Sequence, residues 1–118
     1  MKDVAVVGYC RTGIARAVRG ALNQTHGIPL AAHVLKEVVA RAGVESGEVE
    51  DIVLGCGLPQ GATGHNIGRT AALEAGFDVP GVTVNRYCGS GLTAASMIAS
   101  RIAMGEIACG IAGGVESI

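Results

Sequence analysis

The residue of this sequence best placed for covalent chemistry is Cys88, which stands between an apolar run and a helical pattern. Residues 82–85 are typical of a buried strand, and residues 89–104 are expected to form a helix. A thiol at such a junction lies over unpaired N–H groups and the positive end of the helix dipole, which favour the thiolate. Thiolates of this kind act as nucleophiles at neutral pH. The pattern therefore favours nucleophilic catalysis by Cys88, with a buried structural thiol as the alternative.

The residues beside Cys88 suit a sharp turn that a substrate can approach. Gly89 and Gly91 have no side chain, so they permit both the turn and close contact with the backbone. The turn also leaves the backbone N–H of Cys88 free to face an oxyanion. Ser90 between two glycines is similar to the Gly-x-Ser-x-Gly elbow of hydrolases, but the residue two positions earlier is Cys88 and not Gly. That motif is therefore excluded.

Apolar runs typical of strands alternate with helical patterns along the whole chain. Strands are predicted at residues 4–8, 51–55, 82–85 and 107–112, and helices at residues 29–42, 66–75 and 89–104. This alternation predicts an α/β fold with a largely parallel sheet and helices on both faces. The last helix has Arg101 as its single charge and is apolar on nearly every side, so it is expected to be buried.

Composition narrows the class of protein. The chain has 118 residues, enough for one domain, and a net charge of −1, which gives no reason to expect nucleic acid as a partner. It contains no apolar run that could span a bilayer and no secretory signal at its start. Its four cysteines lack the spacing of zinc ligands, so free thiols in the reducing cytoplasm and no metal site are expected. The end at Ile118, directly after a predicted strand, suggests truncation.

Several other residues invite a functional interpretation that the pattern does not support. Residues 55–61, Gly-Cys-Gly-Leu-Pro-Gln-Gly, follow a strand, but the third glycine comes too late for a dinucleotide-binding turn, so a structural loop is expected. Cys56 and Cys109 lie in apolar runs and are expected to be small buried hydrophobes. The remaining candidates are expected at the surface or partly buried (His26 and His33) or in salt bridges (Arg11, Arg69 and Arg86).

Four sequence blocks together resemble the thiolase family. Residues 85–92, Asn-Arg-Tyr-Cys-Gly-Ser-Gly-Leu, are similar to its nucleophile motif Asn-x-x-Cys-(Gly/Ser)-Ser-Gly. Residues 11–14 (Arg-Thr-Gly-Ile) are similar to an early Arg-Thr-Pro-Ile-Gly block, and residues 64–69 (Gly-His-Asn-Ile-Gly-Arg) to Gly-Gln-Asn-Pro-Ala-Arg. Residues 112–117 resemble Ala-Gly-Gly-Val-Glu-Ser. The departures, such as Gly13 for Pro, lie in loops and bear on rigidity more than on chemistry.

The resemblance implies the amino-terminal half of a thiolase, residues 1–118, and half of a layered αβαβα architecture. Cys88 would take an acyl group from a coenzyme A thioester and pass it to coenzyme A or to the carbanion of acetyl-CoA. Asn85, Gly89, Ser90 and Gly91 would support the turn. No metal and no bound redox cofactor are implied, and the substrates would be acyl-CoA and coenzyme A, handled by a homodimer or homotetramer. The acid–base residues and most of the coenzyme A pocket would lie outside this chain.

Three points stay open at the level of sequence. A ketoacyl carrier-protein synthase would share the strand–cysteine–helix turn, although the block at residues 85–92 favours a thiolase. A second alternative is a non-catalytic fragment that acts as a structural or interaction module. His65 belongs to a loop whose counterpart in the family lies near the subunit interface, so a role near the active site is open for it.

Overall fold

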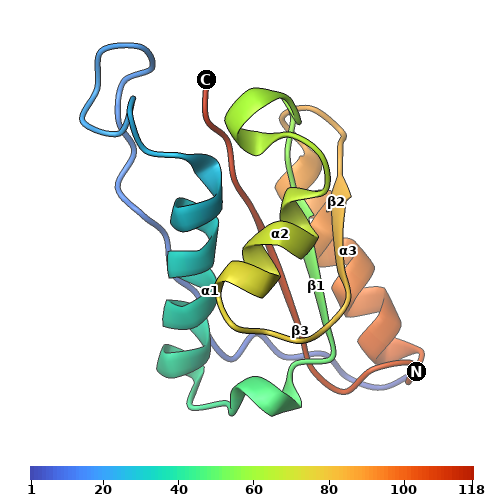
Figure 1. Cartoon of the computed structure of the whole chain (residues 1–118). Helices are drawn as coiled ribbons and strands as arrows, with labels where there is room; N and C mark the ends of the chain where they lie inside the picture. The colour runs from blue at the N-terminus through green and yellow to red at the C-terminus, as the bar shows by residue number, and fades with distance from the viewer.

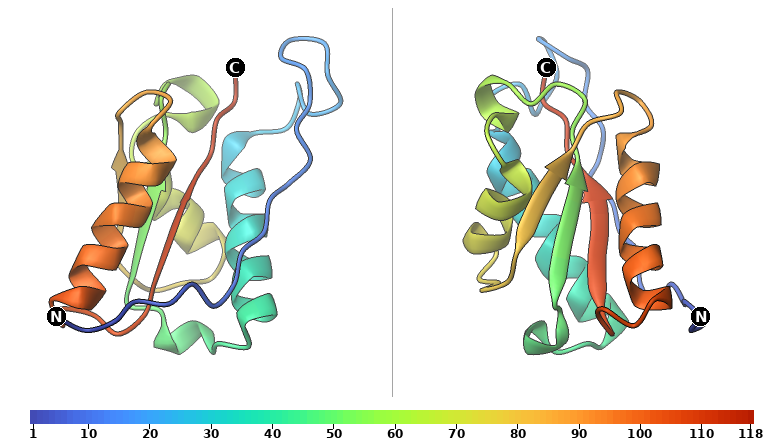
Figure 2. Two further views of the ribbon diagram at one scale, coloured as in Figure 1. Left: turned by 180° about the vertical axis from the view of Figure 1, so that it is seen from behind. Right: turned by 90° about the vertical axis from the view of Figure 1, so that its right-hand side faces the viewer.

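The computed structural model describes residues 1–118 as a central parallel sheet between two layers of helices (Figures 1 and 2). The strands are β1 (Asp51–Gly55), β2 (Gly81–Val84) and β3 (Gly110–Gly114), in the spatial order β2-β1-β3. The α-helices are α1 (Gly27–Ala42), α2 (Ile67–Glu74) and α3 (Ser90–Ala103), and two short 3-10 helices span Ser46–Glu48 and Gly61–Thr63. The predicted α/β class, with a parallel sheet and helices on both faces, is confirmed.

The central strand β1 divides the core into two parts. Its side chains alternate between the two faces of the sheet, as in any strand. Ile52 and Leu54 pack with residues of α1 and α2, whereas Val53 packs with Ala94 and Ile98 of α3. Because both faces are covered, every residue of β1 is buried, which explains its continuous apolar run. The right-hand view of Figure 2 shows α3 on one side of the sheet and the other two helices on the opposite side.

The parallel arrangement brings the carboxyl ends of all three strands to one edge of the sheet. Gly55 ends β1, Val84 ends β2 and Gly114 ends β3, and their registers place these residues side by side. The loop that leads from β2 into α3 and the carboxyl terminus of the chain both lie at this end of the molecule (Figure 1). Loops at this edge of an open parallel sheet are the usual place for a ligand site.

The strand predicted at residues 4–8 is wrong. This segment is not part of the sheet, and no backbone hydrogen bond joins it to another strand. The side chains of Val6 and Val7 are 86% and 65% exposed instead of buried. Strand propensity expresses how well a residue packs on a pleated surface, so an apolar run becomes a strand only where a partner strand and a covering layer exist. Hydrogen bonds anchor this segment on both sides, from the Lys2 N–H to the Ala103 carbonyl and from the Cys10 thiol to the Val34 carbonyl at 3.3 Å.

The helix α3 is also less buried than its sequence predicts. Ser90, Ala94 and Ile98 are its buried residues, while Leu92 is 81% exposed. One side of α3 packs on the sheet, and no other layer of this chain covers the opposite side. Although α3 is rich in apolar residues, neither it nor any other helix is long and apolar enough to cross a bilayer.

Smaller differences concern the ends of elements. The helix α1 begins at Gly27, two residues before Pro29, because His26 acts as its N-cap through a bond from the Ile28 N–H to Nδ1. Gly43 ends it in a left-handed conformation with φ of 66°, as predicted. The strand β3 begins at Gly110 instead of residue 107 and runs through Gly114.

Candidate active site

Cys88 lies in the turn between β2 and α3, and its side chain is exposed. Gly89 is the N-cap of α3 and Ser90 is its first residue, so the thiol precedes the start of the helix by two positions. The N-cap has no side chain that could satisfy the first N–H groups of the helix. The N–H of Cys88 itself donates to no backbone carbonyl. The turn thus offers an accessible sulfur beside unpaired donors and the positive end of the helix dipole.

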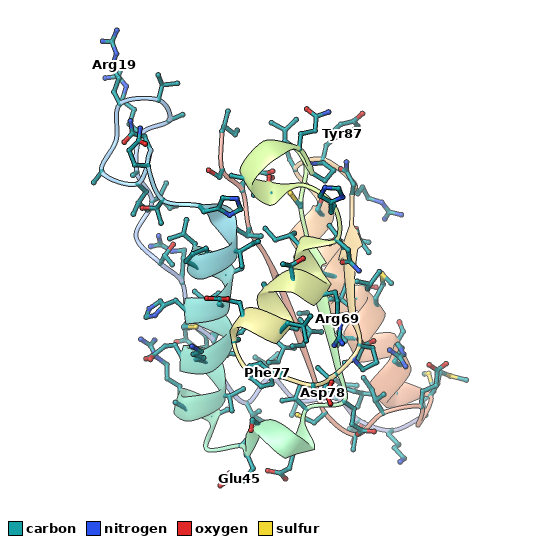
Figure 3. All side chains as sticks on the ribbon, in the orientation of Figure 1. Arg19, Glu45, Arg69, Phe77, Asp78 and Tyr87 are labelled. Carbon is teal, nitrogen blue, oxygen red and sulfur yellow. The ribbon has the colours of Figure 1, made fainter.

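Hydrogen bonds from two side chains hold this turn. The Oδ1 atom of Asn85 accepts the Tyr87 N–H at 2.9 Å, while Ser90 Oγ accepts the Arg86 N–H at 2.8 Å and donates to the Tyr87 carbonyl at 2.6 Å. Tyr87, labelled at the edge of the molecule in Figure 3, has a φ of 46°, which is unusual for a residue with a side chain. Such a conformation costs about 1–3 kcal/mol and persists where surrounding contacts enforce it. Asn85 and Ser90 supply these contacts.

The glycines of the turn do not provide its unusual backbone angle, which falls on Tyr87. Gly89 has a φ of −90°, and a Cβ atom added to Gly91 would meet nothing within 4 Å. The missing side chains therefore leave open space on the solvent side of the turn, which fits the expected approach of a substrate.

Gly55, at the end of β1, is a structural requirement that sequence reasoning missed. A Cβ atom at this position would lie 2.4 Å from the carbonyl carbon of Ser90 and 2.6 Å from the nitrogen of Gly91. The strand therefore touches the backbone of the first turn of α3, and no side chain fits between them. The apolar strand followed by glycine was the available signal, but it did not say which element the glycine would meet.

Glu116 and the loop at residues 56–58 are a second feature that sequence reasoning missed. The carboxylate of Glu116 accepts the N–H of Gly57 at 2.9 Å and the N–H of Leu58 at 2.8 Å. The carbonyl of Gly57 in turn accepts a hydrogen bond from Asn85 Nδ2 at 3.3 Å. The expected structural loop is observed: it leads into the 3-10 helix Gly61–Thr63 instead of the long helix that a dinucleotide site requires.

Two of the other thiols, those of Cys56 and Cys109, differ from Cys88 in their surroundings. All four cysteines are free. Cys56 is fully buried, and burial raises the pKa of its thiol. Cys109 is half-buried; burial, followed by the nearby carboxylates of Glu48 and Glu50, raises its pKa as well. The prediction of a small buried residue is confirmed for Cys56 and holds in part for Cys109.

No histidine forms a hydrogen bond with Cys88. His26 caps α1 and His33 lies on the same helix, both with exposed side chains, as predicted. His65 is exposed in the loop before α2 and has a φ of 56°. No contact of its side chain connects it to the turn, so its role near an active site stays a prediction.

The salt bridges predicted for three arginines are found for one of them. Arg69 lies 4.0 Å from the carboxylate of Asp78 and donates to the Val79 carbonyl, and Figure 3 shows the two charged side chains close together. Arg11 donates to the neighbouring Thr12 carbonyl and forms no ion pair, and Arg86 forms none either. The prediction is wrong for these two, because both are exposed and no carboxylate lies within 4.0 Å of either guanidinium group.

A cavity of about 790 Å³ lies away from this turn. Residues 4–17 line it together with α1, β3 and the inner side of α3, and Cys88 does not contribute to its wall. Most of its lining residues are hydrophobic. It lies along β3, which is an edge strand of the sheet.

The fold and the site geometry thus define an α/β domain with an exposed cysteine at a strand–helix turn. Comparison with known proteins shows which family this domain belongs to. Residues 4–118 match the model of "Thiolase, N-terminal domain". The chain is 38% identical over 120 residues to a 3-ketoacyl-CoA thiolase of Bacillus subtilis, and this alignment covers 100% of the chain and 31% of that relative. It is 34% identical over 119 residues to an acetyl-CoA acetyltransferase of Syntrophomonas wolfei, with 99% and 30% covered.

A eukaryotic relative extends the comparison. A peroxisomal 3-ketoacyl-CoA thiolase B of Candida tropicalis is 39% identical over 120 residues, with 98% of the chain and 29% of that relative covered. The chain spans about three-tenths of the length of these relatives. The chain belongs to the thiolase family, of which it carries the N-terminal domain.

Proposed function

We propose that this chain supplies the nucleophile of an acyltransferase that moves acyl groups between coenzyme A thioesters. The observation that carries the proposal is the exposed thiol of Cys88 at the start of α3, beside a backbone N–H without a partner. The names of the relatives, 3-ketoacyl-CoA thiolase and acetyl-CoA acetyltransferase, support acyl-CoA substrates.

In the proposed reaction the Cys88 thiolate attacks the 3-keto carbonyl of a 3-oxoacyl-CoA. The bond between the second and third carbons breaks, its electron pair leaves with acetyl-CoA as a carbanion, and a general acid protonates this carbon. Coenzyme A thiolate then attacks the thioester on Cys88, releases the shortened acyl-CoA and regenerates the cysteine thiolate. In the reverse direction the Cys88 thiolate attacks acetyl-CoA, and coenzyme A leaves as its thiolate. A general base then removes a proton from the methyl group of a second acetyl-CoA, and the resulting carbanion attacks the thioester on Cys88, takes up the acetyl group and frees the cysteine thiolate. The Cys88 N–H is proposed to bind the oxyanion of the tetrahedral intermediates.

The remaining groups of the reaction are proposed to come from another part of a longer protein. No histidine or carboxylate forms a hydrogen bond with Cys88, so the chain offers no obvious acid–base partner for the thiol. The short coverage of the relatives supports the same division. A homodimer or homotetramer and a cytoplasmic location stay predictions; four of the relatives are named as peroxisomal.

The proposal is tested by mass spectrometry of the protein that carries this chain, after incubation with acetyl-CoA. We expect an acetyl group on the peptide that contains Cys88 and none on the same peptide of the Cys88→Ala variant. Alanine fits an exposed turn, so the variant is expected to fold like the wild type and to lack acyl transfer. Acetoacetyl-CoA cleavage by folded Cys88→Ala protein at a substantial rate would refute the nucleophile assignment.

A specific observation also favours the alternative of a non-catalytic module, namely the open apolar side of α3. Leu92 is exposed there, and the buried residues of the helix lie on its other side. An interaction module would keep this surface without needing a reactive thiol. Slow alkylation of Cys88, at the rate of a denatured control, would favour the module over the enzyme.

A further inference from the structure

Glu116 is connected to the turn of Cys88 by a continuous set of contacts. It follows β3 by two residues, and its carboxylate accepts the N–H groups of Gly57 and Leu58 at 2.9 and 2.8 Å. The thiol of Cys56 donates to the same carboxylate at 3.3 Å. Hydrogen bonds to an ionised acceptor are roughly twice as strong as bonds between neutral groups. One side chain from the end of β3 therefore fixes the loop that follows β1.

The loop at residues 56–58 also supports the turn that contains Cys88. The Gly57 carbonyl accepts from Asn85 Nδ2 at 3.3 Å, and Asn85 Oδ1 accepts the Tyr87 N–H at 2.9 Å. The backbone of Gly57 is also packed against Tyr87, because a Cβ atom at Gly57 would lie 3.3 Å from the Tyr87 carbonyl oxygen. The hydrogen bond to Asn85 and the packing of Gly57 both involve Tyr87, which precedes Cys88 and has the unusual φ of 46°.

We propose that Glu116 is a positioning residue for Cys88, which it holds over the N-terminus of α3 through the loop at residues 56–58. The inference rests on the proposed function of Cys88 as the nucleophile. Without the carboxylate, two backbone N–H groups lose their acceptor and Gly57 is free to move away from Asn85 and Tyr87. The turn can then relax from its left-handed angle, and the sulfur moves away from the unpaired N–H groups and the positive dipole end at the start of α3.

The test compares Glu116→Ala and Glu116→Gln with the wild-type chain. The readout is the rate of alkylation of Cys88 by iodoacetamide across a pH series, followed by peptide mass spectrometry. Amide hydrogen exchange of Gly57 and Leu58 reports the loop itself. Glu50→Gln is the matched control, because Glu50 Oε1 accepts the Ala108 N–H at 2.6 Å at the opposite end of the sheet.

Glu116→Ala is expected to speed amide exchange in the loop and to slow Cys88 alkylation at neutral pH by roughly twofold to fivefold, the value of one interaction with a helix terminus. The pH profile of alkylation should move to higher pH. Glu116→Gln keeps one oxygen acceptor and should show a smaller effect, and Glu50→Gln should leave the Cys88 rate and profile unchanged. If Glu116 only stabilised the loop, its substitution would alter amide hydrogen exchange at residues 57 and 58 without altering the pH profile of Cys88 alkylation.

Faster loop exchange with an unchanged rate and pH profile of Cys88 would overturn the role of Glu116. If Glu116→Ala fails to fold, Glu116→Gln decides by the same criterion. A wild-type Cys88 that reacts no faster than Cys56 would overturn the proposed nucleophile and with it the positioning role. If wild-type Cys88 is alkylated faster than Cys56 and the Glu116 variants leave its rate and pH profile unchanged, only the positioning role of Glu116 is refuted.

Discussion

Replacing Gly55 by alanine tests the contact that sets the start of α3 against the sheet. The new Cβ atom would lie 2.4 Å from the Ser90 carbonyl carbon and 2.6 Å from the Gly91 nitrogen. Non-bonded carbon atoms rest at about 3.5–4.0 Å, so strand and helix would have to separate by roughly 1 Å. The atoms met are backbone atoms, so no side-chain rotation can relieve the overlap.

The expected cost follows from the behaviour of overpacked cores. Inserting one methyl group into a tight site costs about 1–3 kcal/mol, and here it also separates Val53 from Ala94 across the α3 interface. Urea unfolding at low protein concentration, followed by circular dichroism, measures the loss. With an m-value of about 1–3 kcal/mol/M, the midpoint should fall by about 1 M.

The matched control is Gly91→Ala, because the backbone nitrogen of Gly91 takes part in the contact whereas its own Cβ position is open. A Cβ atom at Gly91 meets nothing within 4 Å, and alanine favours the helix over glycine by up to about 1 kcal/mol. This variant should keep or raise the midpoint. A Gly55→Ala protein as stable as the wild type would refute the tight contact between β1 and α3.

Three further predictions concern the thiols and the open surfaces. Iodoacetamide at neutral pH should label Cys88 before Cys56 and Cys109, because Cys88 is exposed while burial raises the pKa of the other two; equal labelling of the native thiols would contradict this. A thiol pKa raised on folding adds stability that is fully present below the unfolded value of 9.0 and is lost as pH rises through the folded value. The free energy of unfolding should therefore fall above about pH 9, and less so in Cys56→Ala; parallel curves would exclude the buried thiol as the cause. Because apolar side chains such as Val6 and Leu92 are exposed, light scattering after size exclusion should show association of this chain, and an acetoacetyl-CoA assay should show no appreciable cleavage; a monomer that cleaves at an enzyme-like rate would contradict both.

Local patterns were sufficient to predict most of the secondary structure. The runs at residues 51–55 and 82–85 became β1 and β2 within one residue. Every residue of β1 is buried, but no residue of β2 is, so the prediction of a buried strand at residues 82–85 is wrong in its burial. The helices were predicted from apolar spacing, and the glycines that directly follow the first two predicted ranges, Gly43 and Gly76, have a positive φ in the structure. Both kinds of signal depend on neighbours within a few residues, which a sequence displays directly.

The failures share a different cause. Residues 4–8 have the composition of a strand, yet pairing depends on a partner segment that lies elsewhere. The support of the Cys88 turn likewise depends on Gly55, Gly57 and Glu116, which belong to other elements and meet the turn only after folding. No periodicity or turn signal encodes such contacts between distant segments. Sequence reasoning therefore proposed Cys88 as a candidate from its immediate neighbours and missed the residues that hold its turn in place.

Catalysis by a nucleophilic cysteine requires both a reactive thiol and groups that transfer protons, and the geometry of the turn favours only the first. A reactive thiol needs to be accessible and to lie beside hydrogen-bond donors, and the exposure of Cys88, its N–H and the start of α3 provide both. Moving protons to and from the substrate needs a base or acid within hydrogen-bond distance, and no side chain of the chain meets that condition at Cys88. A site with the first property alone can be alkylated or acylated slowly but cannot turn over at an enzymatic rate. Restored cleavage of acetoacetyl-CoA on extending the chain, without a change in the alkylation rate of Cys88, would separate the two tasks experimentally.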